Sequence, residues 1–563
     1  MLQFTNRDKV FVTRIVEIIL RRKNIVTGAE AMIKCLEAEG IKLVFGYPGV
    51  AIAPFYEGLY NSGIEHVLVR QEQNAGHAAS GYARMSRRPA VCVVTSGPGA
   101  TNLITALATA YADSIPLIAI SGQVSSKLLG RDVFQEADMR GATRSFVKHS
   151  YLVKDPDDIP RVFKEAFYIA STGRKGPVLI DIPMDVQQAE LRKQFHYPEG
   201  VIIRGYKPEI KINPIQLKRV INLLDQAEKP LICAGGGVIL GNGEQIIREF
   251  CEKFNIPLVH TMMGMGVLPK KHPLNFGMLG NNGKPYANKA VGRADLLLVV
   301  GARIADRAIP KPEKLTRRAI IHIDIDTAEI GKNVGPTIPL VGDLSEIFAL
   351  MLDGDISRKE DSWIEELDEI KRNTVDTRVF SDRLVDPNLM VQKLSEKLDD
   401  DAVYVADVGQ NQLWSADNYI MKEGRFMTTG GMGTMGYSIP AAIGAKLVSP
   451  EKQTVAVIGD GAFQMAMNEL STMRNNNVDL RILLVRNRYL GLVREYQHKN
   501  YDSHYEGVKL SDWPDYGKIA EAYGLTYNEC ISNDELDEKL DWFLEGEGAR
   551  ILVCDVDSEN NVK

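Results

Sequence analysis

The sequence predicts an α/β protein made of three doubly wound parallel-sheet domains, and three observations support this prediction. The predicted strands are short continuous apolar runs, which are typical of parallel strands covered by helices on both faces. Most of these runs end in glycine or proline turns and alternate with helical segments. The length of 563 residues exceeds what one core can use and fits about three or four domains.

The predicted strands fall into three blocks in chain order. The first block has strands at residues 43–45, 67–69, 91–94, 117–120 and 178–182. The second block has strands at residues 231–233, 258–260, 296–300 and 320–323. The third block has strands at residues 403–405, 455–458, 482–485 and 551–553. Polar links at about 186–214 and 354–388 separate the blocks.

These links divide the chain into an N-terminal extension at 1–24 and three domains at 25–190, 191–365 and 366–563. The extension mixes acidic and basic residues around an apolar stretch and has no small-residue cleavage site. We interpret it as a short helix rather than a signal or transit peptide.

Composition excludes several classes of function. The chain has 45% apolar and 25% charged residues, which is ordinary for a soluble globular protein. Its net charge of −6 argues against nucleic acid as the main partner. No apolar run approaches the ~18 residues of a membrane span, so no membrane partner is expected. Six cysteines without a CxxC pair indicate buried thiols in a reducing, cytoplasmic compartment.

A metal-binding pattern stands in the third block. Asp460, in a Gly-Asp-Gly turn, follows one predicted strand, and Asn487 follows the next. Both are expected at the carboxyl ends of parallel strands, where open α/β sheets bind ligands. Carboxylate and amide oxygens suit a hard divalent cation. The alternative is that the glycines form only a tight turn and that Asn487 caps a strand.

A candidate proton-transfer residue stands in the first block. Glu72 comes directly after a predicted strand and before a helix rich in small residues. A carboxylate in this position is able to exchange a proton with a bound group. The alternative is an ordinary surface glutamate.

Together, Glu72, the Asp460–Asn487 pair and the segment Thr-Ser-Gly-Pro-Gly-Ala-Thr-Asn at 95–102 resemble the thiamine diphosphate enzymes. Within that group the chain is similar to the catalytic (large) subunits of acetohydroxyacid (acetolactate) synthases. The resemblance covers roughly residues 25 to 560. The closer match is carried by the segments FGYPG at 45–49, FQEAD at 134–138, GARIADR at 301–307 and NRYLGLV at 487–493.

This resemblance implies an activity and a domain plan. The enzyme would decarboxylate pyruvate on thiamine diphosphate and condense the hydroxyethyl carbanion with a second 2-oxo acid, in branched-chain amino acid biosynthesis. The three domains would bind the cofactor pyrimidine, FAD, and the diphosphate with Mg²⁺, in that order. The resemblance also implies a homodimer or tetramer with the active site between subunits, and a small regulatory subunit as a further partner.

The resemblance assigns cofactor roles to individual residues. Glu72 would hydrogen-bond the pyrimidine, and Gly433 and Met435 would contact it. The Mg²⁺ ligands would be Asp460, Asn487 and the main-chain carbonyl of Tyr489. The diphosphate would lie against Val408, Gly409, Gln410, Asn411, Gly461 and Ala462. The family usually has histidine where this chain has Asn411, and asparagine keeps a hydrogen-bond donor there.

The flavin assignment depends on the resemblance alone, because a glycine run after a strand is by default a turn. In the family this domain binds FAD that takes no part in a net redox step, although related enzymes of the same fold lack flavin. The matching positions are Arg174, Gly235, Gly236, Gly237, Thr261, Met262, Met263, Gly280, Arg303, Asp324 and Asp343.

The expected acceptor pocket combines matches and departures. Arg307 matches the arginine that pairs with the carboxylate of the second 2-oxo acid, a bidentate contact that suits a guanidinium. The alternative is a surface salt bridge with Asp306. The other matching positions are Gln123, Phe134, Gln135 and Tyr496, the last in place of tryptophan. Further departures from the family are Val50, Met184, Asn281, Asn282 and Ala305, and the sequence ends before the family's site-closing tail.

Two other functions fit the same residues. One is a thiamine diphosphate-dependent carboligase or decarboxylase with a more polar acceptor, which Asn281 favours. The other is a catalytically silent subunit that binds and regulates a true synthase. The retention of Glu72, Asp460 and Asn487 argues against a silent subunit.

Overall fold

The computed structural model describes residues 26–562 except 310–318, 336, 376–382 and 512–513. The predicted N-terminal helix at 1–24 lies outside the described residues. Contacts divide the chain into two compact units. The first unit holds the first sheet, within residues up to 206, and the second unit holds the other two sheets, within residues 207–562. The segments 80–88 and 112–114 are grouped with the second unit.

The first sheet has six parallel strands in the order β2-β1-β3-β4-β6-β5. The strands are β1 Leu43–Tyr47, β2 Glu65–Leu68, β3 Ala90–Val94, β4 Leu117–Gln123, β5 His149–Leu152 and β6 Val178–Pro183. The helices between them are α2 Gly28–Ala38, α3 Ala53–Tyr60, α4 Glu72–Ser86, α5 Pro98–Asn102, α6 Ile104–Ala112, α7 Met139–Thr143, α8 Ile159–Ser171 and α9 Met184–Gln188.

The second sheet is also parallel, with the order β12-β11-β10-β7-β8-β9. The strands are β7 Pro230–Ala234, β8 Leu258–His260, β9 Asn275–Met278, β10 Leu296–Val300, β11 Ala319–Asp324 and β12 Ile338–Val341. The helices are α10 Pro214–Gln226, α11 Gly236–Leu240, α12 Glu244–Phe254, α13 Pro285–Arg293, α14 Leu344–Leu352 and α15 Asp361–Arg372. Renumbered from its own first strand, this is the order 3-2-1-4-5-6 of dinucleotide-binding sheets.

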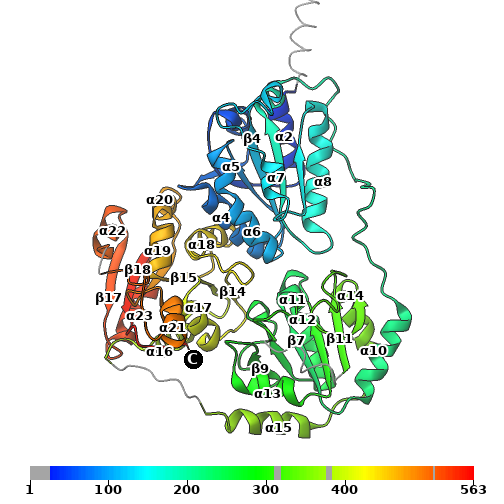
Figure 1. The fold of residues 1–563 in the computed structure, drawn as a ribbon, viewed down its shortest axis with the longest axis vertical. Helices are drawn as coiled ribbons and strands as arrows, with labels where there is room; N and C mark the ends of the chain where they lie inside the picture. Colours follow the sequence, from blue (N-terminus) through cyan, green and yellow to red (C-terminus); the bar gives the residue numbers. More distant parts are fainter. Residues whose placement is uncertain (1–25, 310–318, 336, 376–382, 512–513, 563) are drawn as a thin grey trace, which may run out of the picture. The chain divides into compact units, whose positions relative to one another are not determined.

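The third sheet repeats the strand order of the first, as β14-β13-β15-β16-β18-β17, and is parallel throughout. The strands are β13 Val403–Ala406, β14 Arg425–Met427, β15 Thr454–Gly459, β16 Arg481–Arg486, β17 Thr526–Cys530 and β18 Arg550–Asp555. The helices are α16 Pro387–Lys397, α17 Gln410–Asn418, α18 Ser438–Val448, α19 Asp460–Ala466, α20 Leu470–Asn475, α21 Gly491–Asn500, α22 Tyr516–Ala522 and α23 Leu536–Leu544. Figure 1 shows helices flanking each of the three sheets.

Local sequence explains why these elements form. Helix α2 begins with a capping box, in which Thr27 Oγ1 accepts from the Glu30 N–H and Glu30 Oε2 accepts from the Thr27 N–H. Central strands carry fully buried aliphatic residues, such as Val91 on β3, Ile118 on β4 and Ile180 on β6. Each such side chain contributes about 1.5–3 kcal/mol when it leaves water. The predicted fold class, three doubly wound parallel-sheet domains, is therefore confirmed.

The sequence prediction missed five strands, β5, β9, β12, β14 and β17, and it placed a polar link where α15 lies. The six cysteines are buried free thiols, as predicted. In the part of the chain that the structure describes, no helix is long and apolar enough to cross a membrane.

Candidate active site

The predicted cofactor residues of the third block come together at the carboxyl edge of the third sheet. Residues 407–411 follow β13, residues 430–436 follow β14, Asp460 follows β15 and Asn487 follows β16. Strands β13 and β15 are neighbours, and the order of the sheet reverses between them. A crevice at such a reversal is where open α/β sheets bind ligands.

Asp460 and the loop after Asn487 are joined directly. The Arg488 N–H donates to Asp460 Oδ2 at 2.7 Å, and the Gly461 N–H donates to Asp460 Oδ1 at 3.0 Å. The Asp460 side chain is buried, and burial raises its pKa to about 6 against the lowering effect of these two N–H groups. Asn487 Oδ1 accepts from the Tyr489 N–H at 2.9 Å. The structure thus places the Asp460 carboxylate and the Asn487 amide oxygen at the ends of the neighbouring strands β15 and β16.

Sequence reasoning overlooked a second buried carboxylate, Asp407. Its Oδ1 accepts from the N–H groups of Val408 at 2.8 Å and Gly436 at 2.9 Å, and its Oδ2 accepts from the Ser438 N–H at 2.7 Å. Burial raises its pKa to about 6. Asp407 therefore ties the loop after β13 to the glycine-rich segment that carries Met435. Its position directly after a central strand was the signal that would have found it.

Two other residues predicted to face the diphosphate, Gly409 and Asn411, lie at the start of α17. Gly409 precedes α17 with φ +145°, a backbone that favours glycine. Asn411 Nδ2 donates to the main-chain oxygens of Asp407 at 3.0 Å and Val457 at 3.2 Å. Both of its N–H bonds are thus used inside the protein, so the predicted donor to a phosphate is directed elsewhere.

Helix α19 carries Gly461 and Ala462 in its first turn, and Ala462 is buried. A Cβ on Gly461 would stand 2.9 Å from Leu490 Cδ2 and 3.5 Å from Met435 Cε, so the glycine leaves room where these side chains converge. Gly433 adopts φ +66° and has no atom within 4 Å of the place of a Cβ. The structure therefore brings Met435 next to the Gly-Asp-Gly turn, with an open position at Gly433.

In the first unit, Glu72 is the first residue of α4, close behind β2, as predicted. Asn102 Nδ2 donates to Glu72 Oε2 at 2.9 Å. A Cβ on Gly99 would lie 3.3 Å from Glu72 Oε1. The segment 95–102, which the sequence matched separately, thus wraps the Glu72 carboxylate.

Gln123, predicted for the acceptor pocket, is buried and bonds entirely within the protein. Its Nε2 donates to the main-chain oxygen of Ala137 at 2.8 Å and to Asp181 Oδ2 at 3.0 Å, and its Oε1 accepts from the Val124 N–H at 2.9 Å. Gln123 therefore anchors the segment that carries Phe134 and Gln135.

Two strained turns interlock beside that segment. Gln135 has φ +59°, and a Cβ on Gly97, itself at φ +58°, would stand 2.8 Å from Gln135 Cβ. Phe134 is 86% exposed and Val50 is also exposed. Met184, another departure from the family, is half-buried at the start of α9. The aromatic ring of Phe134 is thus available for contact at the surface of this unit.

In the second unit, the Arg307 side chain is 78% exposed and its Nε lies 3.5 Å from Asp306 Oδ2, which is the surface salt bridge that the sequence also allowed. The Asn281 N–H donates to the Arg307 main-chain oxygen at 2.9 Å, so these two predicted pocket positions are neighbours. Tyr496 lies on α21 and is 59% exposed, with its ring 5.9 Å from that of Tyr501.

The positions predicted to bind FAD in the second unit gather at the carboxyl edge of the second sheet. Asp324 is the last residue of β11, and the others follow the end of a strand: β7 for Gly235 to Gly237, β8 for Thr261 to Met263, β9 for Gly280, β10 for Arg303 and β12 for Asp343. Arg174 lies in the first unit, between α8 and β6.

Some of these positions also stabilise the fold, through close backbone contacts or by capping a helix. A Cβ on Gly237 would lie 2.7 Å from Gly301 Cα, so this glycine is required where the first turn of α11 meets the loop after β10 at the reversal of the sheet. Asp343 Oδ1 caps α14 by accepting from the N–H groups of Ser345 and Glu346. Gly280 has φ +109°, and a Cβ there would collide with the Arg307 main-chain oxygen.

Comparison with known families identifies the architecture. Three family models match the chain: the N-terminal TPP binding domain of thiamine pyrophosphate enzymes at residues 26–142, their central domain at 217–351, and their C-terminal TPP binding domain at 407–554. The protein belongs to the thiamine pyrophosphate enzymes. The match to the N-terminal domain includes Glu72, and the match to the C-terminal domain includes Asp460 and Asn487.

Curated relatives place it further, in the family of acetolactate synthase large subunits. A probable acetolactate synthase large subunit of Methanocaldococcus jannaschii is 44% identical over 526 residues, which cover 91% of this chain and 89% of the relative. The acetolactate synthase large subunit of Corynebacterium glutamicum is 42% identical over 526 residues, covering 91% and 83%. An acetolactate synthase of Arthrospira platensis is 42% identical over 520 residues, covering 89% of both chains.

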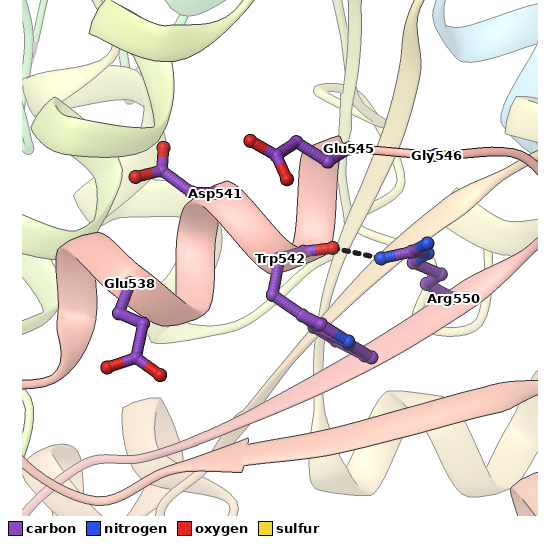
Figure 2. Close-up of a pocket in the computed structure, with 6 residues that line it drawn as sticks. All are labelled: Glu538, Asp541, Trp542, Glu545, Gly546 and Arg550. Atoms are coloured by element: carbon purple, nitrogen blue, oxygen red, sulfur yellow. Dashed lines mark hydrogen bonds between the residues drawn. The ribbon is translucent and has the colours of Figure 1, made fainter.

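A cavity of about 740 Å³ lies elsewhere in this thiamine pyrophosphate enzyme, beside α23 and the start of β18. Figure 2 shows the carboxylates of Glu538, Asp541 and Glu545 around it, with Arg550 donating to the main-chain oxygen of Trp542. Because β18 begins there, the cavity lies at the amino end of that strand, opposite the edge that carries Asp460 and Asn487. Its acidic lining would repel a diphosphate, so it is not the thiamine pyrophosphate site.

Proposed function

We propose that this protein is an acetolactate synthase that decarboxylates pyruvate and joins the remaining two-carbon unit to a second 2-oxo acid. The observation that carries the proposal is the 44% identity, over 91% of the chain, to a relative named as such a large subunit. The site supports it, because Glu72, Asp460 and Asn487 are all present at strand ends.

Bound thiamine diphosphate would supply the carbanion-stabilising chemistry, and the protein would supply orientation and electrostatics. We assign to Glu72 the hydrogen bond to the pyrimidine ring nitrogen, with proton exchange at that atom. Asn102 would hold the Glu72 carboxylate in place through its 2.9 Å hydrogen bond. Met435 and Gly433 would contact the pyrimidine, and the open space at Gly433 fits a group that approaches the backbone closely.

The donor set in the third sheet fits Mg²⁺, which we assign to Asp460, Asn487 and the Tyr489 carbonyl. Oxygen ligands with one carboxylate are typical for this ion when a diphosphate supplies further oxygens. Asp460 is 3% exposed, and a cation beside it would offset the cost of burying a charged carboxylate. Among the described residues, no group of three or more acidic, histidine or cysteine side chains is arranged so that it could hold a metal ion by itself, so the proposed site depends on one carboxylate, an amide and a main-chain carbonyl.

We assign the second 2-oxo acid to a pocket that contains Arg307, Phe134, Gln135 and Tyr496, in a homodimer or tetramer whose active site lies between subunits. Arg307 would leave its exposed ion pair with Asp306 for the substrate carboxylate, which a guanidinium binds through two hydrogen bonds. Light scattering on the purified protein tests the oligomer. A cytoplasmic location and a small regulatory subunit complete this proposal.

We also infer that the second sheet binds FAD. Its strand order is that of dinucleotide-binding sheets, and all eleven matching positions except Arg174 lie at or just after the carboxyl ends of its strands. The purified protein should therefore be yellow and should release FAD on denaturation. A colourless protein that gains no activity when FAD is added would place it with flavin-free thiamine enzymes.

Product analysis tests the function. With pyruvate alone the expected product is acetolactate, and with added 2-oxobutyrate a second acetohydroxy acid should appear. Release of CO₂ with neither product would favour the alternative of a carboligase or decarboxylase with a more polar acceptor, to which Asn281 points. No turnover of pyruvate, together with stimulation of a separate synthase, would favour the silent regulatory subunit.

A further inference from the structure

The side chain of Gln410 lies directly behind Asn487 and links it to the segment that follows β18. Gln410 is 4% exposed. Its Oε1 accepts from Asn487 Nδ2 at 2.7 Å. Its Nε2 donates to the main-chain oxygen of Asn560 at 3.0 Å and to Glu495 Oε1. The same Glu495 oxygen accepts from the Val562 N–H at 3.0 Å.

These bonds fix the direction of two amides in turn. A main-chain carbonyl and a carboxylate only accept hydrogen bonds, so the Gln410 nitrogen must face Asn560 and Glu495. The Gln410 oxygen then faces Asn487, so the Asn487 side-chain nitrogen must donate the hydrogen bond to it. The Asn487 oxygen is thereby held on the other side, where the Tyr489 N–H donates to it. The orientation of the Asn487 amide is thus set by a group about 70 residues further along the chain, in the segment after β18.

The same segment holds the rest of the loop after β16. Arg494 donates to the main-chain oxygen of Ser558 at 2.8 Å and pairs with Glu559. The Arg494 guanidinium also lies over the Tyr489 ring, 5.2 Å from its centroid. Asp555, at the end of β18, pairs with Arg488 at 3.2 Å. The loop that contains Asn487, Arg488 and Tyr489 is therefore attached to the end of β18 and the residues after it at three points.

Gly491, the first residue of α21, leaves the room that this arrangement needs. A Cβ there would collide with Gln410 Oε1 and would stand 2.7 Å from Asn487 Nδ2. The Gln410–Asn487 contact therefore occupies the place of a side chain at position 491.

We propose that Gln410 and residues 556–562 act as a brace that holds the Asn487 oxygen toward the Mg²⁺ site and so sets the affinity of the site for the ion. Gln410 is a positioning residue in this proposal, and the main-chain carbonyl of Asn560 is its anchor. The inference rests on the proposed function, because that function supplies the metal. Groups that orient a metal ligand typically contribute 10–100-fold to metal affinity.

The first experiment is a calorimetric titration of Mg²⁺ into the full-length protein with saturating thiamine diphosphate. Gln410→Met, which keeps the volume and removes the amide, should bind Mg²⁺ about 10–100-fold more weakly. Gln453→Met is the matched control, because Gln453 accepts from the Asp399 N–H at the amino end of β15, the opposite edge of the sheet. It should bind Mg²⁺ as the wild type does. A purely structural role of Gln410 would instead lower the apo melting temperature and leave Mg²⁺ affinity unchanged.

A swapped pair tests the direction of the bonds and carries the test if Gln410→Met fails to fold. Gln410→Glu replaces the Nε2 donor with an acceptor oxygen that faces the Asn560 carbonyl and the Glu495 carboxylate, so it should weaken Mg²⁺ binding. In the double variant Q410E/E495Q the amide at position 495 donates to the new carboxylate, so part of the affinity should return. Equal Mg²⁺ affinity in all variants would overturn the brace. Absence of Mg²⁺-dependent cofactor binding in the wild type would overturn the proposed function instead.

Discussion

The side-chain amide of Asn102 donates a hydrogen bond of 2.9 Å to Glu72 Oε2. The two residues come from different strand ends of the first sheet, because Glu72 follows β2 and Asn102 ends α5, which follows β3. One carboxylate oxygen is therefore held by the protein. The other, Oε1, lies beside Gly99, where the missing side chain leaves room. This arrangement presents a fixed carboxylate to a ligand.

Replacing Glu72 tests its proton-transfer role. Glu72→Gln should still bind thiamine diphosphate but lose turnover by on the order of 10²–10⁴-fold, because an amide cannot share a proton with the pyrimidine nitrogen. Steady-state rates and a cofactor titration on the same preparation separate the two effects. Glu65→Gln, at an exposed position on β2, is the control and should keep full activity. Near wild-type rates for Glu72→Gln would remove the assignment.

Asp460 should be indispensable for metal-dependent cofactor binding. Asp460→Ala removes the single charged oxygen ligand of a hard cation, so thiamine diphosphate should no longer bind more tightly when Mg²⁺ is added. Calorimetry with and without Mg²⁺ measures this. Asp534→Ala, at an exposed position of the same domain, should leave the Mg²⁺ effect intact. Unchanged affinity in Asp460→Ala would mean that the Gly-Asp-Gly segment is only a turn.

Asp181 should make stability fall as the pH rises. Burial raises its pKa to about 7, although Ser121 and Gln123 donate to it and lower it. An unfolded aspartate titrates near pH 3.9, so the stability that Asp181 contributes is complete below about pH 4 and is lost as the pH rises toward 7. The loss is at most about 1.4 kcal/mol for each pH unit in that window.

The variant Asp181→Asn stays neutral throughout, so its melting temperature should rise relative to the wild type between pH 5 and pH 8. Differential scanning fluorimetry across this range measures the difference. Asp158→Asn removes a carboxylate that is 50% exposed and serves as the surface control. A difference for Asp181→Asn that does not change with pH would show that Asp181 ionises as it does in the unfolded chain.

Tyr496 should lower the preference of the enzyme for 2-oxobutyrate over pyruvate as the acceptor. If it lines the pocket, a phenol in place of the family's indole gives the ethyl group of 2-oxobutyrate less surface to pack against. One methylene in an apolar pocket is worth roughly 1–3 kcal/mol of discrimination. The wild type should therefore form mainly acetolactate when pyruvate and 2-oxobutyrate compete, and Tyr496→Trp should shift the products toward the larger acceptor.

Competition at equal acceptor concentrations tests this prediction. Tyr501→Trp is a suitable control, since its ring lies 5.9 Å from that of Tyr496 on the same exposed surface. A strong wild-type preference for 2-oxobutyrate that Tyr496→Trp leaves unaltered would show that Tyr496 does not line the pocket.

The sequence predicted the central strands and the edge strand β2 because they are continuous apolar runs, and each one lies within three residues of its predicted bounds. The five missed strands, β5, β9, β12, β14 and β17, all lie at sheet edges. An edge strand has a neighbour on one side only, and β5 and β17 contain mostly half-buried residues with polar side chains. Their pattern therefore does not differ from that of a loop until the pairing is known.

The placement of candidate site residues was predictable where a residue type and a strand end coincide, as for Glu72, Asp460 and Asn487. The contacts that orient other side chains of the candidate site were not predictable, because they are long-range hydrogen bonds. Three such bonds join residues that are far apart in the chain. They connect Gln123 with Asp181, Ser438 with Asp407, and Gln410 with Asn560. No local pattern carries that information.

The polar edge strands also bear on how this protein behaves in a crowded cell. Every open sheet has two borders with unpaired main-chain groups, and an apolar border is a template on which other chains can grow into aggregates. Strand β5 carries His149, Ser150 and Tyr151, and β17 carries Thr526, Asn528 and Glu529. These two edge strands therefore offer little apolar surface on which another chain could pair. An engineer who replaces these residues with valine or isoleucine to strengthen a strand should expect inclusion bodies rather than a more robust enzyme.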